Sequence, residues 1–190
     1  MTPTVHGQGL PSEWLLRWQH LLPDNAHVLD VACGAGRHTR HLLSLGHQVT
    51  AVDRDAQALA HLQDTTATCL LADLEQGDWP FEAHAFDAVV VTNYLWRPVF
   101  AHIISSLKPG GFLVFETFAI GQETIGKPSR AAFLLAPGEA LHLCAPLHVV
   151  AFENGFEPAT PESAPRYVQR IVATKLPGEG QPPTRHVLRT

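Results

Sequence analysis

The sequence is poor in cysteine, long apolar runs and basic residues. Its three cysteines, Cys33, Cys69 and Cys144, form no CxxC pair and lie in apolar contexts. This pattern predicts buried thiols in a reducing compartment. No apolar run approaches the ~20 residues that span a bilayer, and the N-terminus lacks a basic-then-apolar leader pattern. We therefore expect a cytoplasmic protein that does not associate with a membrane.

Basic charge is also scarce, and no metal-binding motif is present. The 190 residues carry 13 Lys and Arg against 18 Asp and Glu, which gives a formal net charge of −5. Neither a basic stripe nor an aromatic–basic pattern is present, so we expect no nucleic-acid partner. Among the twelve histidines, His38 and His41 share a helix face, but no acid or cysteine stands at ligand spacing and HExxH is absent. We expect no metal site.

Apolar segments of strand and helix type alternate along the chain. Strands are expected over residues 27–32, 48–52, 68–71, 86–92, 112–117, 147–152 and 167–174, with helices over about 11–22, 37–45, 55–63, 97–107 and 137–143. This alternation predicts an α/β fold, a doubly wound, Rossmann-like three-layer sandwich with a mostly parallel seven-stranded sheet. Residues 154–165 are too few for a crossover helix, so the last strand should run antiparallel. We expect one domain over 1–175 and a flexible tail over 176–190.

A glycine-rich turn follows the first expected strand, in HVLDVACGAGRHTR (27–40). Small residues at Ala32, Gly34 and Gly36 let a ligand approach the backbone closely. A dinucleotide fingerprint that begins at Gly34 would place Thr39 where a small residue belongs. A Walker-type lysine is absent, which argues against a phosphate loop. The turn alone leaves open whether the ligand is a dinucleotide, a phosphate or a group without phosphate.

Three aspartates stand in or after three successive strands, and they narrow the choice of ligand. Asp30 lies inside an apolar strand, where an unpartnered carboxylate is costly, and a cationic ligand group would compensate it. Asp53 could accept hydrogen bonds from ribose hydroxyls, and Asp73 from an amino group on a base. The alternative is that Asp53 and Asp73 are helix or turn caps. The set favours a ligand with an ammonium group, a ribose and an adenine.

These segments together resemble the class I S-adenosylmethionine-dependent methyltransferases. VLDVACGAGRHTRHL is similar to their first motif, VTAVDRD to the ribose-binding segment and CLLADLEQGDWPF to the adenine-side loop. FDAVVVTNYL and LKPGGFLVFETF are similar to the fourth and fifth strands, and Ala32 replaces a more usual glycine. NYLWRP and ETFAIG resemble the small bacterial tellurite-resistance-type (thiopurine/tellurite-like) branch.

The resemblance implies S-adenosylmethionine as cofactor, S-adenosylhomocysteine as product and a role for each matched residue. Asp30 and the backbone from Ala32 to Gly34 would hold the methionine end, and Asp53 the ribose. Asp73 and the Leu74 N–H would read adenine, and Asn93 would lie near the sulfonium methyl group. The implied cofactor-binding residues are Asp30, Ala32, Cys33, Gly34, Gly36, Asp53, Arg54, Asp73, Leu74 and Asn93.

On the acceptor side, the candidate catalytic residues are Asn93, Tyr94, Arg97 and Glu116. Tyr94 and Trp96 could wall an apolar acceptor and attract the sulfonium by cation–π interaction, and Arg97 could hold an anionic one. The alternatives are that Trp96 is a core residue of the next helix, that Arg97 and His102 lie on a helix face, and that Glu116 pairs with Arg97 or Arg130. The loop over 119–136 could act as a lid.

We therefore expect a methyltransferase that acts by in-line methyl transfer on a small-molecule acceptor. Two alternatives remain open, a non-catalytic S-adenosylmethionine-binding protein and a nicotinamide-dependent oxidoreductase. Methyl transfer needs no dedicated protein nucleophile, because the cofactor supplies the reactive group. The oligomeric state is not predicted.

Overall fold

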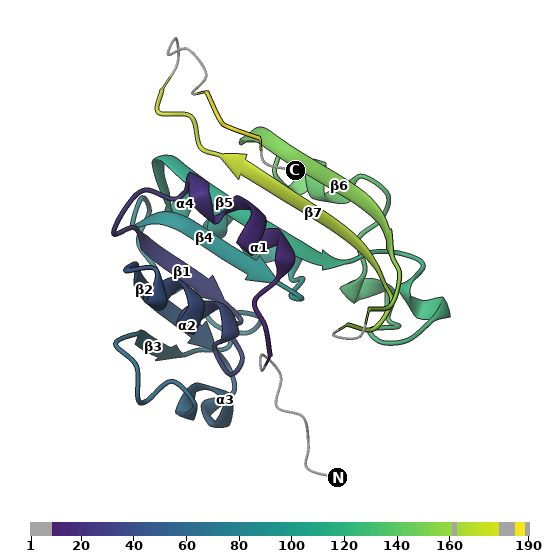
Figure 1. Cartoon of the computed structure of the whole chain (residues 1–190), viewed down its shortest axis with the longest axis horizontal. Coiled ribbons are helices and arrows are strands. Elements are labelled where there is room, and N and C mark those ends of the chain that lie inside the picture. Colours follow the sequence, from purple (N-terminus) through teal and green to yellow (C-terminus); the bar gives the residue numbers. More distant parts are fainter. Residues whose placement is uncertain (1–8, 161–162, 179–184, 189–190) are drawn as a thin grey trace.

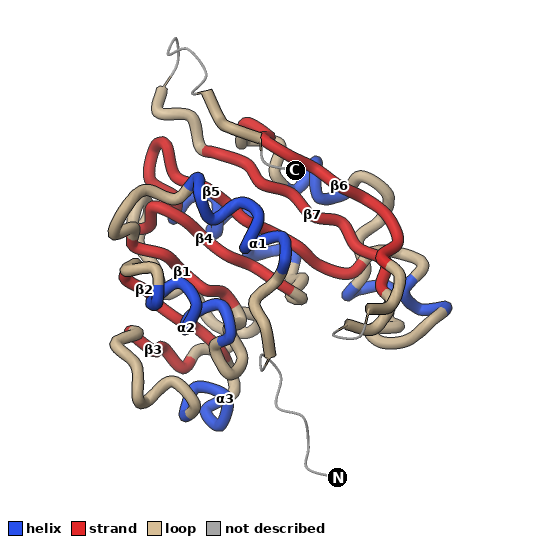
Figure 2. The backbone as a smooth tube through the Cα atoms, in the orientation of Figure 1, coloured by secondary structure: helices blue, strands red, loops and turns tan. Residues whose placement is uncertain are grey.

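The computed structural model describes residues 9–160, 163–178 and 185–188. Figures 1 and 2 show one central sheet with helices on both of its faces. The strands are β1 (His27–Val31), β2 (Gln48–Asp53), β3 (Thr68–Leu71), β4 (Phe86–Thr92), β5 (Leu107–Phe118), β6 (His148–Glu157) and β7 (Arg166–Thr174). The α-helices are α1 (Glu13–Trp18), α2 (Arg37–Ser44), α3 (Ala56–Ala60), α4 (Phe100–Ser106) and α5 (Glu139–Leu143). Short 3-10 turns η1 (Gln19–Leu21), η2 (Arg97–Val99), η3 (Gln122–Thr124) and η4 (Ala131–Phe133) complete the set.

The seven strands lie in the order β3-β2-β1-β4-β5-β7-β6. β1 to β5 pair in parallel, whereas β7 pairs antiparallel with both β5 and β6. The predicted α/β fold, with a mostly parallel sheet and an antiparallel last strand, is confirmed. Because β1 lies between β2 and β4, the chain changes direction across the sheet between β1 and β4. Ligands of doubly wound sheets bind at such a switch point, outside the carboxyl ends of the strands.

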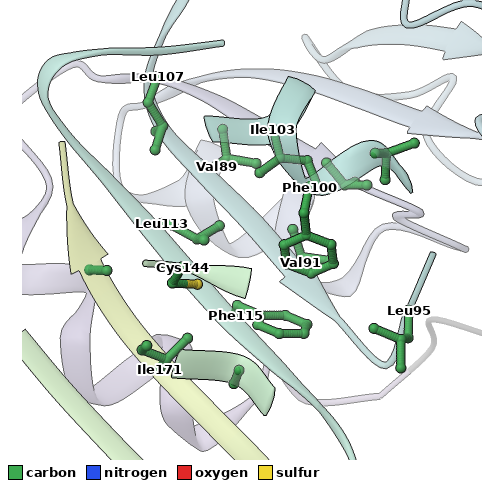
Figure 3. Packing of buried hydrophobic residues seen from close by; sticks show 14 of the residues in the cluster. Val89, Val91, Leu95, Phe100, Ile103, Leu107, Leu113, Phe115, Cys144 and Ile171 are labelled. Carbon is green, nitrogen blue, oxygen red and sulfur yellow. The ribbon is translucent and has the colours of Figure 1, made fainter. Parts of the chain in front are cut away.

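Two apolar layers cover the sheet, and strand alternation decides which side chain joins which layer. On one face, Val89 and Val91 of β4 pack with Ile103 of α4 and with α5, in the cluster of Figure 3. On the other face, Val90 packs with Trp14 of α1 and with α2. Successive strand residues point to opposite faces, so a strand buried on both faces is apolar throughout, as the sequence of β4 is.

The structure departs from the sequence-based expectations at strands β3 and β5. β3 is an edge strand, and Cys69 is exposed on it, so the expectation of three buried thiols is wrong for this residue. β5 begins at Leu107 rather than Phe112, because a β-bulge lets the Lys108–Gly111 turn join the strand. Of the expected tail, residues 179–184 and 189–190 lie outside the described residues. The part around Val187 contacts His20 through a 2.9 Å hydrogen bond.

None of the helices in the described ranges has the length and hydropathy of a membrane-spanning segment. The same residues hold no group of three or more His, Cys, Asp or Glu side chains placed to bind a metal ion.

Candidate ligand-binding site

A cavity of about 310 Å³ opens at the carboxyl ends of β1, β2, β3 and β4, at the switch point of the sheet. Its floor and walls come from the segments that follow these four strands. The lining residues are Ala32, Cys33, Gly34, Arg37, His38, Val52, Asp53, Arg54, Ala72, Asp73, Leu74, Glu75, Thr92, Asn93 and Tyr94. The structure therefore brings together nearly all of the expected cofactor-binding residues.

The glycine turn forms one wall through left-handed backbone at three positions. Ala32, Gly34 and Gly36 have φ values of 53°, 55° and 82°. A Cβ atom on Gly36 would lie 2.3 Å from the side chain of Leu62, so glycine is required there. Three backbone N–H groups of the turn, including those of Cys33 and Gly36, are already used within the protein. The turn consequently has few free donors for a phosphate.

Asp53 and Asp73 both line the cavity, and both also cap local backbone. Asp53 accepts hydrogen bonds from the N–H groups of Gly34 at 2.7 Å and Asp55 at 2.9 Å. Asp73 accepts one from the Glu75 N–H at 2.9 Å. Carboxylate oxygens each have a second lone pair, so both groups retain acceptor capacity toward a ligand. Capping and ligand binding are compatible at these two positions.

Asp30 does not line the cavity, although the sequence suggested a direct contact with a cationic ligand. Its side chain is 1% exposed and accepts a 2.6 Å hydrogen bond from the Thr39 hydroxyl of α2. Burial raises the pKa of Asp30 to about 6 and outweighs the hydrogen bonds from Thr39, which lower the pKa. Asp30 therefore holds the start of α2 against β1 from beneath the glycine turn.

Asn93 and Tyr94 line the cavity directly after β4. Asn93 has a φ of 54°, and its N–H donates to the carbonyl oxygen of Glu116 at 2.9 Å. Left-handed backbone at a non-glycine residue costs free energy and is frequent at functional sites. The Tyr94 hydroxyl is buried and has no hydrogen-bond partner in the described part of the chain. Burial and the nearby Glu75 carboxylate raise the pKa of Tyr94, so its phenol stays protonated at neutral pH.

Arg97 and Glu116 do not line the cavity, unlike Asn93 and Tyr94. Arg97 pairs with Glu139 at 2.5 Å and donates to the carbonyl oxygens of Ala132 and Leu134, so it ties the expected lid loop to α5.

Glu116 is fully buried. It pairs with Arg166 at 3.2 Å and Arg170 at 3.5 Å, rather than with Arg97 or Arg130. The partners of both residues come from distant parts of the chain, which residue spacing does not reveal. His102 is exposed on α4 and stacks against Trp79, as expected for a helix-face residue.

Six residues that line the cavity were not predicted from the sequence: Arg37, His38, Val52, Ala72, Glu75 and Thr92. His38 accepts a hydrogen bond from the Ser12 N–H at 3.1 Å through Nε2 and contacts the Thr92 hydroxyl at 3.3 Å through Nδ1. Burial, followed by the Arg37 charge, lowers the pKa of His38 to about 3. Arg37 and His38 directly follow the glycine turn at the start of α2, and that position in the sequence was the available clue.

Comparison with known proteins gives a family match and several relatives. Residues 28–111 match the family model described as "Methyltransferase domain". A tRNA U34 carboxymethyltransferase from Methylococcus capsulatus is 31% identical over 138 residues, which cover 63% of this chain and 42% of that protein. A malonyl-[acyl-carrier protein] O-methyltransferase from Salmonella typhimurium is 35% identical over 104 residues, which cover 50% and 40%. The chain thus spans less than half the length of these relatives.

Solved structures show the same fold at lower identity. A SAM-dependent methyltransferase from Methanosarcina mazei has a TM-score of 0.64 at 20% identity, covering 83% of this chain and 96% of that one. TehB from Haemophilus influenzae has a TM-score of 0.66 at 18% identity, covering 79% and 57%. The likeness to the tellurite-resistance-type branch is thereby confirmed as a likeness of fold.

One expectation is overturned by the relatives. We expected a small-molecule acceptor and no nucleic acid, yet relatives from three bacteria are named for action on tRNA. The net charge of −5 sums over the whole chain and does not describe the surface at the mouth of one cavity. Composition was therefore insufficient to exclude a nucleic-acid partner.

Proposed function

We propose, from the premise that this chain belongs to the class I S-adenosylmethionine-dependent methyltransferases, that its cavity binds S-adenosylmethionine and directs methyl transfer to a nucleoside of RNA. The match of residues 28–111 to the methyltransferase-domain model and the shared fold support this premise. The observation that carries the proposal is the cavity at the switch point, which collects the polar groups that follow four successive strands.

The residues present fit this cofactor. Asp53 and Asp73 each keep lone pairs free for hydroxyl or amino donors, and both line the same cavity. The N–H groups of Cys33, Gly34 and Gly36 already donate within the protein, which leaves the turn few donors for a pyrophosphate and disfavours a nicotinamide dinucleotide. We assign the ribose to Asp53 and the adenine to Asp73 and the Leu74 N–H.

The bound cofactor would supply a methyl group activated on a sulfonium. The chain's own contribution is orientation and exclusion of water, and orientation alone can supply about 7–11 kcal/mol. Asn93, with its strained backbone at the end of β4, places an exposed amide at the cavity mouth. We propose that this amide positions the acceptor, and that the half-buried ring of Tyr94 covers the reacting groups from water.

The RNA acceptor is supported by the names of the tRNA-directed relatives and by the chemistry of the mouth. Arg54, with a side chain 63% exposed, lies on the cavity rim and pairs only loosely with Glu75, at 3.5 Å. Guanidinium and amide groups are the ones that contact phosphates and unstacked bases in RNA complexes. Such an acceptor would place the protein in the cytoplasm, as the sequence predicted.

Calorimetry tests the cofactor part of the proposal. We expect S-adenosylmethionine and S-adenosylhomocysteine to bind and NADH not to bind. Asp53→Ala should weaken S-adenosylmethionine binding about 10- to 100-fold, because a charge-assisted hydrogen bond to the ribose is lost. Asp64→Ala is the matched control, since Asp64 pairs with Arg40 on the surface. Unchanged affinity in Asp53→Ala would remove the ribose assignment.

Transfer of a radiolabelled methyl group tests the acceptor. The purified chain is incubated with labelled S-adenosylmethionine and either bulk tRNA or malonylated acyl carrier protein. We expect label that ribonuclease releases from the tRNA. Label only on the carrier protein would replace the RNA assignment, and binding without label in either would favour the non-catalytic alternative.

A further inference from the structure

A second cavity, of about 220 Å³, lies beyond β5 and takes no part in the reaction proposed above. One wall comes from the β6–β7 hairpin, and the other from the two ends of the loop that follows β5. Ala119 and Ile120 begin this loop, and Leu135 and Pro137 end it. Drug-sized ligands occupy about 300–1,000 Å³. The smaller space here suits one ring system rather than a whole nucleotide.

Two cross-strand residue pairs form the hairpin wall of the second cavity. Asn154 pairs with Gln169, and Phe156 with Tyr167, in the antiparallel register of β6 and β7. Because alternate strand residues share a face, all four side chains point to the sheet face that carries α4 and α5. The rings of Phe156 and Tyr167 lie 4.9 Å apart between centroids, at 49° to each other. The hairpin therefore presents two aromatic rings beside two amides.

Hydrogen bonds within the protein hold the loop against the hairpin. The buried Gln122 side chain accepts a hydrogen bond from the Tyr167 N–H at 2.9 Å, and Gln169 donates one to the carbonyl oxygen of Ala136 at 2.6 Å. A Cβ atom on Gly121 would lie 2.8 Å from the Tyr167 ring, so the loop passes directly against this ring. The cavity is thus formed by the protein alone, and a preformed site loses less conformational entropy when it binds a ligand.

The described lining of the second cavity has no charged side chain, but it has unused polar groups. The Asn154 amide and the Tyr167 hydroxyl make no hydrogen bond within the described part of the chain. Phe156 and Ile120 also line the cavity and are 50% and 51% exposed. A neutral lining gives a phosphate or a carboxylate no counter-charge. A flat ring with polar edges can stack on the aromatic side chains and hydrogen-bond to the amide, as unstacked bases do.

The loop beside the second cavity also carries two exposed cations, Lys127 and Arg130. Neither forms an ion pair with any residue that the structure describes. Side chains of this kind contact the phosphates of nucleic acids, whereas aromatic side chains stack on the bases. A neutral, aromatic cavity next to a cationic loop is therefore complementary to a single strand of RNA, which has flat bases on an anionic backbone.

We propose that the second cavity binds an unstacked base of the RNA substrate, one that neighbours the methylated nucleoside in the strand. The inference rests on the proposed function, in which the first cavity serves the methylated nucleoside. Ala119 directly follows β5, so both cavities lie at the edge where the parallel strands end. β7 lies two strands from β4 in the sheet, a separation of about 10 Å. A base held at the hairpin would fix the register of the RNA strand without touching the reacting atoms.

Fluorescence anisotropy on the full chain tests this with a short fluorescein-labelled oligouridylate and an abasic oligomer of the same length. Phe156→Ala removes the more exposed ring. Phe133→Ala is the matched control, because Phe133 lies on the same loop and is 38% exposed but does not line the cavity. A double variant, Lys127→Gln with Arg130→Gln, tests the phosphate contacts. Hexanoyl-pantetheine probes for an acyl chain as the occupant, and thermal unfolding verifies that each variant is folded.

We expect the unaltered chain to bind the oligouridylate about 5- to 100-fold more tightly than the abasic oligomer. Phe156→Ala should reduce this preference at least about 5-fold, and Phe133→Ala should keep it. The double variant should weaken both oligomers and lower the slope of log K against log salt by about 1.4. No preference in the unaltered chain, or an unchanged preference in folded Phe156→Ala, overturns the inference. Binding of hexanoyl-pantetheine that Phe156→Ala abolishes also overturns it.

Methyl transfer to tRNA separates this inference from the proposed function. Phe156→Ala should raise the KM for tRNA about 5-fold and leave kcat nearly unchanged, because the base is held away from the reacting atoms. A fall in kcat without a change in KM would contradict the inference and leave the proposed function standing. Absence of label on tRNA with the unaltered chain refutes the proposed function, whereas the oligouridylate preference and its loss in Phe156→Ala are measured without methyl transfer.

Discussion

Replacing the buried Glu116 by glutamine should destabilise the protein without abolishing cofactor binding. Glu116 accepts hydrogen bonds from Arg166 at 3.2 and 3.3 Å, from Arg170 at 3.5 Å and from the Ser12 hydroxyl at 2.9 Å. Glutamine keeps one acceptor oxygen and turns an NH₂ group toward a guanidinium. Removing one partner of a buried ion pair typically costs about 3–5 kcal/mol. Because both arginines also contact Glu157, we expect the lower end, about 3 kcal/mol.

Denaturant unfolding measures this change, and thermal unfolding should show a fall in Tm of about 6–12 °C for a chain of this size. Glu153→Gln is the matched control, because Glu153 shares the partner Arg170 but has a side chain 39% exposed. Its cost should stay below about 1 kcal/mol. If Glu116→Gln is as stable as the control and loses methyl transfer, the structural role argued here is refuted and Glu116 is catalytic.

Three further variants test the surroundings of the glycine turn. Ala32→Gly should stabilise the fold by up to about 1 kcal/mol in denaturant unfolding, because it relieves a left-handed alanine; a loss of stability would contradict the strain. Asp30 has a folded-state pKa raised from 3.8 to about 6, so its contribution to stability is lost as pH rises between these values. Asp30→Asn should therefore gain stability relative to the unaltered chain as pH rises from 4 to 6, and a constant difference would contradict the raised pKa. His38 has a pKa lowered from 6.5 to about 3, so its neutral form stabilises the fold at neutral pH and this contribution is lost as pH falls below 6.5. Unfolding of His38→Gln between pH 4 and 7 should show a shallower loss toward acid, and identical profiles would show that His38 is not held neutral.

The sheet could be predicted because each strand is marked by the sequence of that strand itself. An apolar run such as Val89–Val91 marks a strand buried on both faces, and short intervening helices require parallel crossovers. The antiparallel direction of β7 followed from the short segment before it, which has too few residues for a crossover helix. The extension of β5 back to Leu107 did not follow, since a glycine turn that joins a strand through a β-bulge reads as a loop.

Site residues could be predicted where their position along the chain decides whether they line the cavity. They were harder to predict where the direction of the side chain decides it. Asp53 and Asp73 follow strand ends, and strand ends meet at one edge of the sheet. Asp30 lies two residues after Val28, so both side chains point to the same face of β1. That face is covered by α2, and Asp30 therefore contacts Thr39 instead of the ligand cavity. The pairing of Glu116 with Arg166 and Arg170 spans about fifty residues and depends on the tertiary fold.

The exposed Cys69 on edge strand β3 makes this chain suited to labelling at one position. Cys33 and Cys144 are buried, and burial raises the pKa of both thiols, which slows their reaction with maleimides. A fluorophore on Cys69 would stand four residues before Asp73, outside the cavity but on the segment that leads into it. Its emission would report occupancy of the nucleoside side in real time, with no change to any residue proposed to touch the ligand.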